Sequence, residues 1–114
     1  MCSAQPLDLV FLIDGSDSIM IADFEKIKEW ITDLITLLES AKLKQATNIV
    51  ITQFSTSAQT EVQSTVNDHS IVEKINQIEQ MAKGTNLYAG LSHINHNIAE
   101  GYCLACFDFL TKFK

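Results

Sequence analysis

The apolar positions of this chain fall into short runs and helical stripes that alternate along the sequence. Five consecutive apolar residues, Leu9 to Ile13, predict a first strand over residues 7–14 that is buried on both faces. A second buried strand is predicted over residues 48–54, and weak polar alternation predicts an exposed edge strand over residues 59–66. The strands therefore indicate a sheet with a buried centre and a polar edge.

Three helices are predicted from apolar residues that recur at steps of three and four, over about residues 22–40, 69–82 and 87–100. Charged side chains of the first helix, Lys28 among them, are expected to form a solvated face. The stripes of the first two helices are Phe24, Ile27, Ile31, Leu34, Ile35 and Leu38, then Ile71, Ile75, Ile78 and Ala82.

The order strand, helix, strand, strand, helix, helix predicts an α/β fold with a doubly wound, mostly parallel sheet and helices on both faces. At 114 residues the chain has room for one domain, which we place at residues 6–114. In such sheets ligands bind outside the carboxyl ends of the strands, where the strand order reverses. The loop that follows the first strand is predicted to lie there.

Composition narrows the class of protein. A hydrophobic content of 46% with 19% charged residues is typical of a globular domain. The net charge of −6 argues against nucleic-acid binding, because no basic stripe is available to neutralise phosphates. The sequence has no apolar run near the roughly 20 residues that membrane insertion requires, and its start does not resemble a signal peptide.

The candidate chemistry lies directly after the first strand. Asp14, Ser16 and Ser18 place one carboxylate and two hydroxyls at alternate positions. Hard oxygen ligands of this kind suit Mg²⁺ or Mn²⁺. The spacing alone leaves a second interpretation open, in which these side chains cap a turn and the following helix.

The pattern Asp14-x-Ser16-x-Ser18 after a hydrophobic strand resembles the metal-ion-dependent adhesion site of von Willebrand factor type A domains, which include the integrin inserted domains. Thr85, within Lys83–Leu87, matches the family's threonine, which joins the same metal from a second loop.

The resemblance extends beyond the metal loops. Residues 6–14 are similar to the first strand of integrin and matrilin-like matrix members, and residues 51–55 are similar to the family's second strand. Together the similar segments cover roughly residues 6–100.

The resemblance implies a function as well as a fold. It implies a divalent-cation-dependent, adhesion-type protein-binding module in which Mg²⁺ or Mn²⁺ captures a Glu or Asp side chain of a partner. The partners of extracellular relatives are matrix or cell-surface proteins, so we expect an extracellular or cell-surface location. Cys2, just ahead of the first strand, agrees with that location.

The last residues depart from the family pattern. The family fold continues for further strands and helices, and it carries another aspartate at the end of the next central strand. Tyr102 to Phe107 could be that strand, which would make Asp108 the missing metal ligand. Alternatively, residues 101–114 are a divergent tail of a fold incomplete at its C-terminal end, and Asp108 is solvated.

An incomplete fold has an expected physical consequence. Without the later strands, the far edge of the first strand would be uncovered, and self-association through that exposed edge would follow.

The remaining metal-ligand residue types are assigned structural roles. Cys103 and Cys106 form a Cys-x-x-Cys pair inside an apolar run, which favours small buried hydrophobes over a zinc or redox site. His93 and His96 are spaced for a metal on a helix, but no acidic or cysteine partner accompanies them, so surface positions are expected.

Two other functions stay open beside the binding module. One is a truncated, non-binding fragment of a type A domain protein. The other is a metal-dependent hydrolase or phosphotransfer enzyme, which would need a general base or basic clamps near the metal. The sequence shows neither a Gly-rich phosphate loop nor a nucleophile elbow, so we do not expect an enzyme.

Overall fold

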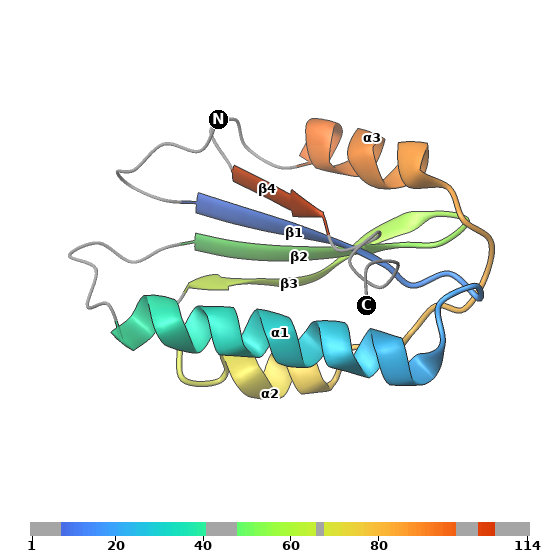
Figure 1. The fold of residues 1–114 in the computed structure, drawn as a ribbon. Helices are drawn as coiled ribbons and strands as arrows, with labels where there is room; N and C mark the ends of the chain where they lie inside the picture. Colours follow the sequence, from blue (N-terminus) through green and yellow to red (C-terminus); the bar gives the residue numbers. More distant parts are fainter. Residues whose placement is uncertain (1–7, 41–47, 66–67, 98–102, 107–114) are drawn as a thin grey trace.

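Four strands form one twisted sheet in the computed structural model, which describes residues 8–40, 48–65, 68–97 and 103–106 (Figure 1). The strands are β1 (Asp8–Asp14), β2 (Asn48–Phe54), β3 (Ala58–Thr65) and β4 (Cys103–Cys106). Their order across the sheet is β3-β2-β1-β4, with β1 parallel to both neighbours and β3 antiparallel to β2. The mostly parallel sheet is therefore confirmed, with β2 and β1 as its two inner strands.

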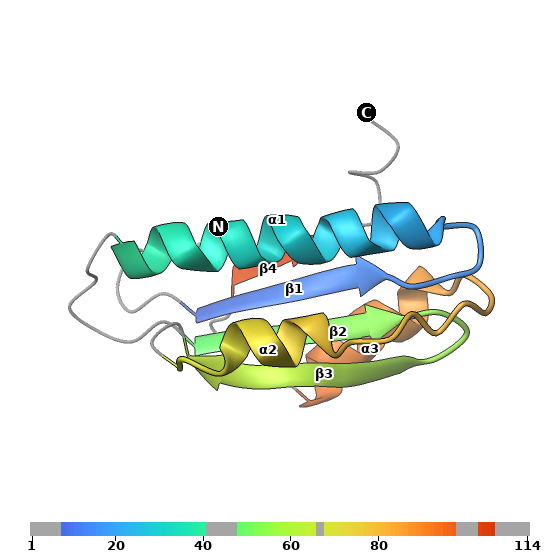
Figure 2. The same ribbon diagram turned by 90° about the horizontal axis from the view of Figure 1, so that it is seen from below.

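Helices cover both faces of this sheet. Helices α1 (Ile21–Ser40) and α2 (Ile71–Asn76) lie on one face and α3 (Leu87–Asn97) lies on the other (Figure 2). The doubly wound α/β class is thus confirmed, and the strand order reverses at β1. Of the helices that the structure describes, none is long and apolar enough to cross a membrane.

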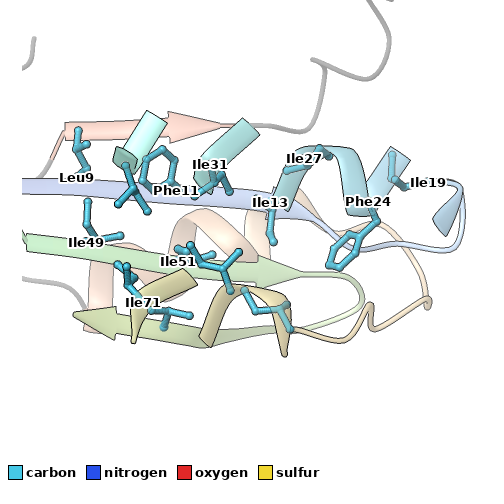
Figure 3. Close-up of a cluster of buried hydrophobic side chains, with 14 residues drawn as sticks. Leu9, Phe11, Ile13, Ile19, Phe24, Ile27, Ile31, Ile49, Ile51 and Ile71 are labelled. Atoms are coloured by element: carbon cyan, nitrogen blue, oxygen red, sulfur yellow. The ribbon is translucent and has the colours of Figure 1, made fainter. Parts of the chain in front are cut away.

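The larger core lies between the sheet and helices α1 and α2 (Figure 3). Alternate residues of β1 point into it because side chains of a strand alternate between the faces. The intervening Val10 and Leu12 are also fully buried, as expected for a strand covered on both faces. The α1 and β1 members of this core are Phe24, Ile27, Ile31 and Ile35 with Leu9, Phe11 and Ile13.

Helix α2 is shorter than the sequence predicts. It ends at Asn76 rather than near residue 82, and the chain continues as a non-helical segment, residues 77–83, which we call the strap. Ile78 is buried as predicted, but Ala82 is exposed, with a φ of 58°. The predicted C-terminal end of this helix, near residue 82, is therefore wrong.

Lys28 contributes to the early end of α2. The prediction that it belongs to a solvated face is wrong, because only 4% of it is exposed. Its Nζ donates to the main-chain oxygens of Asn76 at 3.1 Å and Ile78 at 2.8 Å, and it pairs with Glu25 at 3.1 Å. A lysine from α1 thus satisfies carbonyls at the end of α2 that further helical turns would otherwise use.

The expectation of an uncovered β1 edge is also wrong. Residues Leu9–Leu12 pair in parallel with β4, which lies within the segment Tyr102–Phe107 that the sequence offered as a strand. The edges of the described sheet are β3 and β4, and most of β3 is polar or exposed, which discourages further pairing. Cys2, Gly101 and Asp108 lie outside the described residues.

The turn before α2 is organised by Asp68. Its carboxylate accepts hydrogen bonds from the Ser64 hydroxyl, from the main-chain N–H of Ser70 at 2.9 Å, and from the Ser70 hydroxyl at 2.7 Å. Lys74 Nζ lies 2.9 Å from the same carboxylate. These donors, Ser64 first, hold the pKa of Asp68 well below its usual range.

We predict that Asp68 makes folding stability depend on pH. Because its pKa is lower in the folded chain, the ionised carboxylate stabilises the fold above the unfolded pKa of about 4, and this contribution is lost as the pH falls below that value. Asp68→Asn should therefore lower the melting temperature at pH 7, and the difference from wild type should shrink towards pH 3. The exposed Asp33→Asn variant is the control. A difference that stays constant with pH would contradict this role.

Candidate metal centre

Asp14 ends the central strand and is buried, with 2% of its surface exposed. Its Oδ1 accepts the main-chain N–H of Ser16 at 2.9 Å. Among the described residues no Lys, Arg or His forms an ion pair with it; the two ion pairs that the structure shows there join Lys28 to Glu25 and Lys74 to Asp68. A buried carboxylate without a cationic partner is costly, so this position favours a bound cation.

The two serines follow that carboxylate in the same loop. Ser16 is fully buried and Ser18 is exposed, and their hydroxyl oxygens are 2.9 Å apart. The hydrogen bond from Ser16 N–H folds the loop back on Asp14, so the structure brings Asp14, Ser16 and Ser18 together. Asp17, between the serines, is exposed.

The turn at Gly15 has no room for a side chain. Its N–H donates to the Phe54 carbonyl at 2.9 Å, and its own carbonyl accepts the Ala82 N–H at 2.7 Å. A Cβ at this position would lie 1.7 Å from Gln53 Oε1. Only glycine therefore lets the Asp14 loop lie against Gln53 without displacing that side chain.

The loop that carries Thr85 is anchored on both sides of that residue. Before it, the Lys83 carbonyl accepts the Asp17 N–H at 2.7 Å, and the Gly84 carbonyl accepts the Ser55 hydroxyl at 2.8 Å. After it, the Asn86 N–H donates to the Ser55 carbonyl at 2.8 Å. Thr85 itself is exposed, and the residues on both sides of it are fixed by these hydrogen bonds.

Several residues that position these loops were not predicted. Ser55 both donates to Gly84 and accepts the Lys83 N–H at 2.9 Å. Gln80 Nε2 donates to the main-chain oxygens of Ser16 at 2.9 Å and Ile19 at 2.8 Å. Their only signal in the sequence is a polar side chain next to an apolar element, which does not reveal a partner distant along the chain.

The donor set fits a hard divalent cation. The candidate ligands are the buried Asp14 carboxylate and the hydroxyls of Ser16, Ser18 and Thr85, all of them oxygen atoms. Within the described residues no group of three or more His, Cys, Asp or Glu side chains could hold a metal. His93 is instead 2.9 Å from the Thr60 hydroxyl through Nε2, and the predicted ligand Asp108 lies outside the described residues.

Comparisons with known proteins show the family of the chain. The family model of the von Willebrand factor type A domain matches residues 8–101, so the chain belongs to that family. It is 34% identical to matrilin-1 of Gallus gallus over 104 residues and 30% identical to matrilin-2 of Mus musculus over 95 residues. These alignments cover 87% and 82% of the chain but only 21% and 10% of those relatives.

Solved structures share the fold at lower sequence identity. The structure of proximal thread matrix protein 1 from the mussel byssus, with a zinc-occupied MIDAS motif, has a TM-score of 0.69 and 17% identity. It covers 90% of this chain, which in turn covers 28% of that protein. BatB from Bacteroides thetaiotaomicron has a TM-score of 0.66 and 18% identity, covering 90% of this chain and 52% of BatB. At these identities the likeness establishes the fold alone.

We predict that Gly15→Ala is strongly destabilising, because its Cβ would overlap the buried Gln53 side chain. Overpacking of this severity should lower the free energy of unfolding by about 3 kcal/mol in urea denaturation. Gly84→Ala is the matched control, since its Cβ would meet only the Thr56 methyl carbon, at 2.8 Å. A Gly15→Ala variant as stable as wild type would show that the loop can move away from Gln53.

Proposed function

We propose that this chain is a metal-dependent protein-binding module whose ligand is an acidic side chain of a partner protein. The observation that carries the proposal is the buried Asp14 carboxylate, which has no cationic partner among the described residues and accepts the N–H of Ser16, whose hydroxyl in turn contacts that of Ser18. Asp14, Ser16, Ser18 and Thr85 are its proposed ligands, and Asp108 is a further candidate. Membership of the type A domain family supports the same assignment.

The chemistry follows from the charges of the donors. When bound, Mg²⁺ or Mn²⁺ would supply a Lewis-acidic centre that accepts a carboxylate oxygen. Asp14 contributes the one negative charge of the described set, and the hydroxyls contribute none. The chain's own residues therefore leave a net positive charge for a partner's Glu or Asp to neutralise.

The similarity to matrilins and to collagen alpha-4(VI) supports an extracellular setting with matrix or cell-surface partners. We do not expect the module to be an enzyme, because the sequence shows neither a Gly-rich phosphate loop nor a nucleophile elbow. Oxygen ligands favour Mg²⁺ or Mn²⁺, but the zinc-occupied site of the mussel protein makes Zn²⁺ a third cation to test.

A non-binding fragment is the second candidate function. The observation that favours it is that the chain spans only 10–21% of the matrilins it matches. In that case the loops would keep their arrangement without useful affinity for metal.

We predict that Mn²⁺ binds the wild-type chain, measured by calorimetry and by the loss of the free-ion signal in electron paramagnetic resonance. Asp14→Ala should weaken binding by about 100-fold or more, since even indirect partners of metal sites contribute 10–100-fold. Asp17→Ala removes an exposed neighbouring carboxylate and should bind like wild type. Mg²⁺ and Zn²⁺ should compete for the same site.

Each alternative has its own outcome in this titration. Absence of Mn²⁺ binding by folded wild type would favour the non-binding fragment. Equal losses of Mn²⁺ affinity in Asp14→Ala and Asp17→Ala would indicate general electrostatic attraction of the cation instead of a specific coordination site. A further loss in Asp108→Ala would add Asp108 to the ligands.

A further inference from the structure

The strap, residues 77–83, is held to the rest of the domain mainly by polar contacts. Ile78 is its only buried apolar side chain. From the end of α2 the chain runs towards the carboxyl ends of β1 and β2, where α3 begins (Figure 2). Because Thr85 follows two residues after the strap, the groups that fix the strap also fix the approach of Thr85 to the metal loop.

Gln53 is one of these groups, and none of its surface is exposed. Its Oε1 accepts the Met81 N–H at 2.7 Å, and its Nε2 donates to the Glu79 carbonyl at 2.9 Å and to Glu61 Oε2 at 2.5 Å. Both N–H groups and the carbonyl of the amide are therefore used, and this network fixes which end of the amide faces Met81.

The same side chain also lies against the metal loop. The closest approach is at Gly15, where an added Cβ would be within 2.8 Å of three Gln53 atoms. Gln53 is thus placed between the turn that follows Asp14 and the strap that leads to Thr85. Gln80 adds a second link, because its amide donates to the carbonyls of Ser16 and Ile19.

We propose that Gln53 is a positioning residue for the metal site, and this inference rests on the proposed function. Its amide holds Glu79 and Met81 at a fixed distance from the Asp14 loop and so sets where the Thr85 hydroxyl lies. Gln53 does not touch the metal, and its effect on affinity passes through Thr85. Loss of the amide leaves Asp14, Ser16 and Ser18 in place while Thr85 moves away from them.

The competing explanation is a purely structural amide. Gln53 would then stabilise the fold by satisfying buried main-chain groups, with no influence on metal affinity. Stability measurements do not separate the two roles, because both predict a lower melting temperature. Metal affinity and its coupling to Thr85 do separate them.

The test compares Mn²⁺ affinity in Gln53→Met and Gln59→Met. Methionine keeps the length of the side chain and removes all three hydrogen bonds. Gln59 is the matched control, since it donates to the same Glu61 Oε2 at 2.8 Å but lies exposed on β3. We expect the dissociation constant to rise about tenfold in Gln53→Met and to change less than about twofold in Gln59→Met.

A double-mutant cycle with Thr85→Ala tests the route of the effect. If Gln53 acts through Thr85, then adding Gln53→Met to the Thr85→Ala variant should raise the Mn²⁺ dissociation constant by less than about twofold. The inference would be overturned if Gln53→Met weakened Mn²⁺ binding equally in the wild-type and Thr85→Ala chains. It would also be overturned if Gln53→Met alone did not weaken Mn²⁺ binding. Unaltered amide hydrogen exchange of residues 82–86 in Gln53→Met would overturn it as well.

Two further outcomes keep this test distinct from that of the proposed function. Failure of wild type to bind Mn²⁺ would overturn the metal-site proposal and this inference together, whereas strong binding by both wild type and Gln53→Met would overturn the inference alone. If Gln53→Met does not fold, Gln80→Met replaces it, because Gln80 lies half-buried in the strap and also links it to the metal loop. The same tenfold loss and the same dependence on Thr85 are expected there.

Discussion

The buried carboxylate of Asp14 is the constraint on which the carboxyl end of the sheet depends. Strand β1 is covered on both faces, so Asp14 at its end is almost completely buried next to the apolar core. A negative charge at such a position needs either hydrogen-bond donors or a cation. The Ser16 N–H supplies one donor within the described residues, and the neighbouring hydroxyls give the remaining charge a setting suited to a divalent ion.

Parallel pairing explains why distant segments meet at this charge. Asp14 is in register with Phe54, so the loops that follow β1 and β2 leave the sheet side by side, and Gly15 bonds to Phe54 while Ser55 fixes the neighbours of Thr85. The strap is linked to the Asp14 loop by the Ala82 N–H and by the amides of Gln53 and Gln80. The candidate site, with Ser16 buried and Ser18 and Thr85 exposed, thereby rests on a buried polar framework, which is the kind of support that a well-defined metal geometry would require.

Local patterns predicted most elements because burial imposes a period on the sequence. The apolar run before Asp14 and the stripe of α1 gave the correct element types, and the Asp14-x-Ser16-x-Ser18 spacing identified a loop whose residues the structure joins by hydrogen bonds. The end of α2 was predicted too late because Lys28, 50 residues before Ile78, satisfies the carbonyl there.

The role of Gln53 was missed for a similar reason. It occupies the position where alternation after Ile49 and Ile51 would place a third core residue, but its partner Met81 is 28 residues away. Contacts between residues so far apart leave no periodic signal, so the sequence identified the candidate ligands and not the groups that hold them.

Anomalous diffraction from crystals soaked in Mn²⁺ would test the central claim most directly. The account predicts one strong peak beside Asp14, about 2 Å from the hydroxyl oxygens of Ser16 and Ser18. The Thr85 hydroxyl should coordinate the same ion, directly or through a water molecule. A well-ordered Asp14 loop without a peak, or Mn²⁺ bound only at surface carboxylates elsewhere, would contradict the account.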